Sequence, residues 1–109
     1  MVQPKLKVEF QYFEGCPNYQ IMMDNLKEAI KGLEDFIDVI YRLIKDQEDA
    51  VKYKFRGSPT LLINNEDLIG VESPVYPTLS CRYYPEGIPS PAFIREKIVA
   101  RFSDDRESY

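Results

Sequence analysis

The chain has 109 residues, with 14 basic and 18 acidic side chains and a formal charge of −4. Hydrophobic residues make up 44% and charged residues 29%, which is typical of one globular domain with a single core. The acidic balance argues against nucleic-acid binding, because that function needs basic patches. No apolar run approaches the ~20 residues of a membrane span, and charges interrupt the N-terminal segment, unlike in a signal peptide. We therefore expect a cytoplasmic protein that binds neither nucleic acid nor membrane.

Histidine is absent from the sequence. This excludes Ser-His-Asp and Cys-His catalysis and zinc sites that use histidine ligands. The only two cysteines, Cys16 and Cys81, cannot form a four-cysteine metal site within one chain. Any chemistry therefore depends on thiols, carboxylates, tyrosines or backbone dipoles, and no cofactor is expected.

The first half of the chain shows two strand patterns and two helix patterns. Apolar and polar residues alternate over 5–13, which predicts a strand with one apolar face. The period becomes helical over 17–33, a segment that begins with proline, the residue favoured at a first helical position. Residues 36–44 are rich in β-branched and aromatic side chains and predict a second strand. A short helix is predicted over 46–54, with Asp46 as its N-cap.

The second half begins with a hairpin. Residues 60–64 and 67–70 are predicted to form its two strands, joined by a turn at 64–66. The proline-rich residues 71–90 predict a long irregular loop, and loops of that length are usually functional or mobile.

A last helix is predicted from Ser90 and Pro91 to about Phe102. The charged residues 103–109 are predicted to form a flexible tail, so the single domain spans 1–102. The element order is strand–helix–strand–helix–strand–strand–helix, and a right-handed crossover makes the first two strands parallel. The predicted fold is therefore α/β with a four-stranded mixed sheet.

This order of elements resembles the thioredoxin fold. Cys16 lies in the loop between the first strand and the first helix, where thioredoxins carry a Cys-x-x-Cys pair. Gly57-Ser58-Pro59-Thr60 resembles the thioredoxin segment with a cis-proline immediately before the third strand. The resemblance implies a thioredoxin-like βαβαββα fold and a cis Ser58–Pro59 bond, although only ~5–6% of such bonds in proteins are cis.

A narrower resemblance covers nearly the whole chain. Three blocks are similar to a small bacterial thioredoxin-like family, whose members are often described as thioredoxin-family or alkylmercury-lyase-like proteins, mostly without demonstrated activity. These blocks are Phe13-Glu14-Gly15-Cys16-Pro17-Asn18-Tyr19, Phe55-Arg56-Gly57-Ser58-Pro59-Thr60 and Leu79-Ser80-Cys81-Arg82-Tyr83. Together they are fairly specific for the family but not for a reaction, because a fold does not determine a function.

The sequence departs from the thioredoxin pattern at two positions. Tyr19 stands where the second cysteine of Cys-x-x-Cys would be, so exchange through that pair is excluded. Phe13 stands where peroxiredoxins carry a hydroxyl residue, which disfavours a peroxidase. Tyr19 is a candidate hydrogen-bond donor to a substrate, or else a packing residue. Pro59 is expected to shape the site and leave backbone groups free to pair with an extended peptide or thiol substrate, and Ser58 beside it is a further candidate for substrate binding.

Cys81 is a candidate partner for Cys16. In the predicted topology the loop after Gly70 emerges on the side of the sheet where Cys16 lies, so cysteines 65 residues apart can meet. Organomercurial lyases also use two distant cysteines, with an acidic residue soon after the first. The nearest candidate for that residue here is Asp24, eight positions after Cys16.

Cys16 is predicted to be the N-cap of the first helix. Unpaired N–H groups and the helix dipole provide about half a positive charge there, which favours a reactive thiolate. Arg56 and Arg82 are candidates to add positive charge, and Glu14 would oppose them. The alternative is that Cys16 is a small hydrophobic residue that closes the core.

The function that these observations predict is thiol–disulfide exchange. Cys16 would attack a disulfide to give a mixed disulfide, and Cys81 would release the product by forming a bond with Cys16. The expected partner is a thiol or disulfide substrate, either a small molecule or a protein. Two alternatives remain open. The two sulfurs could capture a soft metal or an organomercurial, or the chain could be a non-catalytic interaction module in which Cys81 is an inert loop residue.

Overall fold

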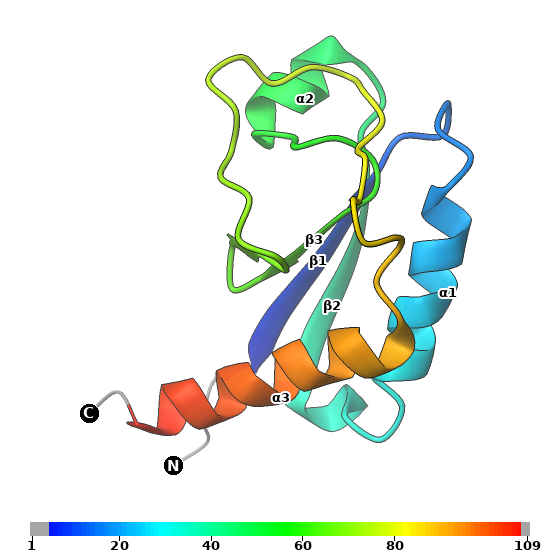
Figure 1. Ribbon diagram of the computed structural model, residues 1–109. Coiled ribbons are helices and arrows are strands. Elements are labelled where there is room, and N and C mark those ends of the chain that lie inside the picture. The colour runs from blue at the N-terminus through cyan, green and yellow to red at the C-terminus, as the bar shows by residue number, and fades with distance from the viewer. Residues whose placement is uncertain (1–4, 108–109) are drawn as a thin grey trace.

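The computed structural model describes residues 5–107. The architecture of this part is mixed α/β, with a four-stranded sheet and three α-helices, as the sequence predicts at this level (Figure 1). In chain order the elements are β1 (Leu6–Tyr12), α1 (Tyr19–Ala29), the 3₁₀ turn η1 (Glu34–Phe36), β2 (Ile37–Leu43), α2 (Gln47–Lys52), β3 (Thr60–Ile63), β4 (Glu66–Asp67) and α3 (Pro91–Glu107).

The strands lie in the order β2-β1-β3-β4. β1 pairs parallel with β2, with Leu6 opposite Ile37, and antiparallel with β3, with Val8 opposite Ile63. β3 and β4 form the antiparallel hairpin. Both the parallel first pair and the hairpin are therefore confirmed, and β1 is a central strand.

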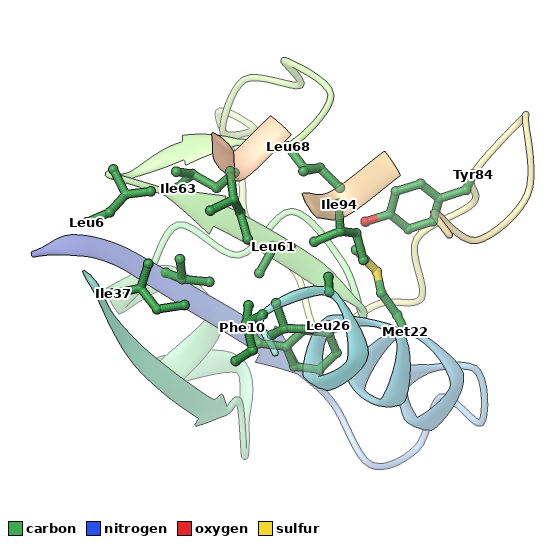
Figure 2. Packing of buried hydrophobic residues seen from close by; sticks show 14 residues of the cluster. Leu6, Phe10, Met22, Leu26, Ile37, Leu61, Ile63, Leu68, Tyr84 and Ile94 are labelled. Carbon is green, nitrogen blue, oxygen red and sulfur yellow. The ribbon is translucent and has the colours of Figure 1, made fainter. Parts of the chain in front are cut away.

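The main core lies between one face of the sheet and the helices α1 and α3, which lie side by side over it (Figure 1). The alternation in β1 turns Leu6, Val8 and Phe10 to this face, where all three are buried. Figure 2 shows Leu6 and Phe10 among the side chains that both helices and β3 contribute. The buried residues contributed by the helices and β3 are Met22, Leu26, Ala29, Ile94, Ile98, Leu61 and Ile63.

α1 is shorter at both ends than predicted. It begins at Tyr19 with Asn18 as its N-cap, so Pro17 precedes the helix instead of opening it. It ends at Ala29, and Gly32 then adopts a left-handed conformation with a φ of +85°. Glycine tolerates that conformation without strain, which is why the helix stops before residue 33.

The hairpin strand β4 lies earlier than predicted. Asn64 and Asn65 form the turn, with φ values of +49° and +69°, and β4 consists of Glu66–Asp67 instead of 67–70. Asparagine is favoured in two-residue hairpin turns because it tolerates positive φ. The chain turns again at Gly70, where φ is +84°, so the return strand cannot continue.

The other two helices are also close to their predicted positions. Asp46 is the N-cap of α2, as predicted, and its carboxylate accepts a hydrogen bond from the Asp49 N–H at 2.9 Å. α3 continues past Phe102 to Glu107, so the backbone of 103–107 is helical where a tail is predicted. Residues 108 and 109 lie outside the described part. Within residues 5–107, no helix is both long and apolar enough to cross a membrane.

Candidate functional site

Cys16 and Cys81 form a disulfide bond between residues 65 positions apart, with a Cα–Cα distance of 5.7 Å. That distance is typical of a disulfide. The loop after β4 does return to the end of β1 where Cys16 lies, so the predicted meeting of the two cysteines is confirmed. The two partners differ in burial, because Cys16 is only 2% exposed whereas Cys81 is exposed.

The predicted position of Cys16 at the helix start is wrong. Cys16 lies two residues before the Asn18 N-cap, in a turn closed by its N–H bonding to the Phe13 carbonyl at 3.1 Å. Its sulfur lies 3.6 Å from the Ser58 carbonyl oxygen. In the reduced protein the thiol can donate a hydrogen bond to that oxygen. Cys16 is therefore a buried sulfur beside a carbonyl, not an exposed one at the start of a helix.

Ser58 attaches the Cys81 segment to the rest of the domain. Its N–H donates to the Ser80 carbonyl and its carbonyl accepts from the Arg82 N–H, both at 2.8 Å, so Ser58 and Cys81 form a parallel β-bridge. The Ser58 hydroxyl accepts a further bond from the Phe13 N–H at 2.9 Å. The backbone groups of Ser58, next to Pro59, are therefore not free for a substrate, because the protein's own loop occupies them.

The Ser58–Pro59 peptide bond is cis, as the resemblance to thioredoxins implies. The Pro59 carbonyl accepts a hydrogen bond from the Tyr84 hydroxyl at 2.6 Å. Tyr84 belongs to the core, whereas its neighbour Tyr83 is 82% exposed. Figure 2 shows the Tyr84 ring beside Met22 and Ile94. Burial raises the pKa of Tyr84, and the positive charge of Arg82 only partly opposes this. Pro59 and Tyr84 thus form a second attachment between the loop and β3.

Arg82 and Asp67 form a buried ion pair with two parallel bonds. Arg82 Nη1 lies 2.5 Å from Asp67 Oδ1 and Nη2 lies 2.8 Å from Oδ2. Their side chains are only 6% and 1% exposed. Nη1 also donates to the Thr60 hydroxyl at 3.2 Å, and Asp67 Oδ2 accepts from the N–H groups of Ile69 and Val71 at 3.1 Å each. Such bidentate pairs are strong and specific in direction.

The positive charge of Arg82 lowers the pKa of the Asp67 carboxyl. Burial alone would raise the pKa of the Asp67 carboxyl, but the hydrogen bonds and charge of Arg82, aided by two backbone N–H donors, hold it below its usual value. The guanidinium also lies 4.6 Å from the centre of the Tyr84 ring. The sequence-based suggestion that Arg82 would activate Cys16 is therefore replaced by a structural role, in which Arg82 fixes the loop against β4.

The other candidate residues make contacts away from the disulfide. Arg56 donates from Nε to the Val71 carbonyl at 2.8 Å. The Tyr19 ring stacks on Tyr12 with centroids 4.8 Å apart, which supports the packing alternative for Tyr19. Asp24 lies exposed on α1 and accepts a hydrogen bond from a side chain one turn earlier.

The sequence reasoning missed the Asp67–Arg82 pair, since both residues stand in segments where charges are normally solvated. Gly57 is the one local signal that could have pointed to it. Gly57 has a φ of +103°, and a Cβ atom there would lie 2.9 Å from the Arg82 Cβ. A glycine at that position therefore marks a close approach of two backbones.

Within the described residues, no group of three or more histidine, cysteine, aspartate or glutamate side chains is placed to hold a metal ion. The two cysteine sulfurs remain as candidate soft-metal ligands. In comparisons with known proteins, the chain matches no protein-family model and no curated protein. These comparisons therefore add no support to the resemblance to thioredoxin-like proteins, which depends on the order of elements and on the three sequence blocks.

Proposed function

We propose that this chain is a thioredoxin-like thiol oxidoreductase whose redox-active group is the Cys16–Cys81 disulfide. Three features support the thioredoxin-like assignment: the strand order β2-β1-β3-β4 with β3 antiparallel to β1, a cysteine in the loop between β1 and α1, and a cis-proline directly before β3. Fold likeness alone does not establish an activity. The proposal therefore depends on the properties of the cysteine pair.

The observation that carries the proposal is the unequal burial of the two cysteines. Exchange requires an incoming thiolate to reach one sulfur of the disulfide. Cys81 is exposed and Cys16 is buried, so the incoming thiolate attacks Cys81. Cys81 then carries the mixed disulfide and Cys16 is the resolving cysteine. This assignment reverses the one that the sequence suggests, in which Cys16 attacks.

The reductive half-reaction uses a dithiol partner. One partner thiolate bonds to the Cys81 sulfur, the Cys16–Cys81 bond breaks, and Cys16 leaves with the electron pair and takes up a proton. The second partner thiol then displaces Cys81 and leaves the partner as a disulfide. Two electrons and two protons pass to the protein. In the opposite direction the Cys81 thiolate attacks a substrate disulfide, and Cys16 releases the reduced substrate.

The contacts around Cys81 keep the two sulfurs together after reduction. The two backbone bonds at Ser58, the Tyr84–Pro59 bond and the Arg82–Asp67 pair do not depend on the disulfide. They hold residues 80–84 against the same site in either redox state. Because the reacting groups are already in position, the internal step has little entropy to lose.

Two variants that each keep one cysteine test the proposal, because each replaces the other cysteine by serine. With glutathione disulfide, we expect Cys16→Ser to accumulate one glutathione on Cys81, while Cys81→Ser reacts slowly because Cys16 is buried. Intact mass and peptide mapping measure the adduct. Wild type with a dithiol reductant should reduce a model protein disulfide, and both variants should lose this turnover. A wild type without turnover, or an adduct that forms faster on Cys16, contradicts the proposal.

A second candidate function is capture of a soft metal ion by the reduced pair. The 5.7 Å separation of the Cα atoms allows both sulfurs to bind one ion, and thiolates prefer soft metals in low coordination. This candidate predicts one mercury(II) ion per reduced chain, bound far more tightly than by either single-cysteine variant, with no exchange turnover. A chain that does neither is an interaction module with a structural disulfide.

A further inference from the structure

β2 forms one edge of the sheet and presents a row of backbone groups to its outer side. At the other edge β4 has two residues, whereas β2 has seven. The Ile44 N–H donates to the Tyr12 carbonyl, so even-numbered residues of this segment face β1. The alternation of a strand then turns the N–H and C=O groups of residues 37, 39, 41 and 43 outward. Among residues 5–107, no hydrogen bond is found for these outward groups.

The sequence of β2 suits antiparallel pairing with a second copy of itself. When the two-fold axis lies at Ile40, Val39 faces Tyr41 and Ile37 faces Leu43 of the other copy. All four outward residues of each strand then exchange backbone hydrogen bonds. The nearest alternative registers shift one strand by two residues and still place outward residues opposite each other. In each of them either Ile37 or Leu43 has no outward residue of the other β2 strand opposite it. The central register therefore satisfies the most backbone groups.

The same register pairs opposite charges. Asp38 lies opposite Arg42 of the second copy, and symmetry repeats the contact on the other side of Ile40. Both contacts fall at non-hydrogen-bonded positions, where facing side chains approach closely and opposite charges stabilise the pair.

Both charged side chains can make these contacts. The Asp38 side chain is 66% exposed, and its nearest cation, Lys5 Nζ, is 3.9 Å away. Arg42 uses Nε for Glu9 at 3.1 Å and Nη1 for the Tyr53 hydroxyl at 3.3 Å, which leaves Nη2 for Asp38 of the second copy.

We propose that two copies of this chain associate through their β2 edges, antiparallel about Ile40, and join their sheets into one. Charge complementarity between Asp38 and Arg42 selects a second copy as the occupant of this edge. Exposed edge strands readily accept another strand, and this one is neither shortened nor covered in the described part of the chain. The interface does not involve the cysteine pair, so the inference is independent of the proposed function.

The test measures molecular mass by sedimentation equilibrium at protein concentrations up to roughly millimolar. This range is needed because an interface made by one pair of edge strands is small, and small interfaces are usually weak. We expect the wild-type mass to approach twice the 12.8 kDa of one chain. Asp38→Arg and Arg42→Asp each place like charges opposite one another and should weaken association roughly tenfold or more. An equimolar mixture of the two variants should associate again, because every facing pair is then opposite in charge. Glu96→Arg is the control, because Glu96 is exposed on α3 and lies outside β2. This change should leave the association as it is in the wild type.

A backbone variant gives an independent test. Val39→Pro removes an outward N–H and no bond to β1, a placement that edge strands tolerate, so it should reduce association in a folded chain. Circular dichroism of each variant verifies folding, since Arg42→Asp also removes the contacts with Glu9 and Tyr53. A wild type that stays monomeric at every concentration overturns the proposal. That result is expected if the β2 edge binds only a strand from a different protein. A dimer unaffected by these changes overturns it as well.

Discussion

Two regions of this domain are held together by different forces. Under α1 and α3, buried aliphatic and aromatic side chains pack on the apolar face of the sheet. Residues 80–84 are instead fixed by a few directional contacts: the bridge at Ser58, the Tyr84–Pro59 hydrogen bond, the Arg82–Asp67 pair and the disulfide. Tyr84 is the one residue of this segment that also belongs to the core.

Because the two regions are held by different forces, changes in pH and in redox state should affect their stability differently. Apolar burial is non-directional and depends little on pH or redox state. Ion pairs, hydrogen bonds between polar groups and disulfides respond to protons and thiols. The loop that carries Cys81 is therefore attached by contacts that acid or a reductant can weaken while the apolar core stays packed.

The largest effect is expected in the apolar region. Phe10 is completely buried in β1 between the two helices. Phe10→Ala removes most of a large side chain and leaves a cavity, which should lower the free energy of unfolding by about 3–5 kcal/mol. Urea denaturation measures the loss. The cysteines should still pair in this variant if it remains folded, and failure to do so would show that the two regions are not separate.

Reduction of the disulfide is expected to have the next largest effect on stability. The bond closes a loop between residues 65 positions apart, and its loss should lower the free energy of unfolding by about 2–4 kcal/mol. Urea denaturation with and without a dithiol reductant measures this. The double variant Cys16→Ser/Cys81→Ser is the control and should not respond to the reductant. Hydrogen exchange of the core amides in the folded reduced protein should resemble that of the oxidised protein, and a collapse of core protection would contradict the comparison.

Removal of the Arg82 side chain tests the polar attachment. Arg82→Leu leaves the Asp67 carboxylate buried without its partner and should lower the free energy of unfolding by about 2 kcal/mol. This is less than for a pair deep in the core, because Cys81 and Tyr83 on either side of Arg82 are exposed, so water can reach the unpaired carboxylate once the guanidinium is gone. Adding Asp67→Leu removes the unpaired charge and should restore part of the loss. If the double variant is less stable than Arg82→Leu, the desolvation argument is wrong.

Acid should weaken the same attachment by a smaller amount. The pKa of Asp67 is lower in the folded protein than its ordinary value of 3.8, so this residue stabilises the fold above that pH. The contribution should diminish as the pH falls below about 4 and disappear below the folded-state pKa. Denaturation at a series of pH values checks this against Asp67→Asn, which should lack this part of the acid dependence. An identical acid dependence in both proteins would contradict the assignment.

The sequence alone predicts most of the sheet and its apolar face. The alternation in β1, the β-branched run of β2 and the Asn64-Asn65 turn are local signals, and each element lies within a few residues of its predicted bounds. The meeting of Cys16 and Cys81 follows from topology, because the order of strands determines to which end of the sheet each loop returns.

The electrostatics of the site could not be predicted in the same way. The burial of Cys16, the pairing of Arg82 with Asp67 and the occupation of the Ser58 backbone all depend on contacts between residues distant in sequence. The position of the α1 N-cap differs from the predicted one by only two residues, but this places Cys16 in the turn before the helix, where its N–H bonds to the Phe13 carbonyl.

The central claim is that Cys81, not Cys16, is the sulfur that reacts with a partner. Peptide-resolved alkylation of the reduced wild type, followed over time at several pH values, measures this directly. We expect Cys81 to be labelled roughly tenfold faster or more, because alkylation needs an accessible thiolate. Labelling of Cys16 at an equal or greater rate would contradict the account.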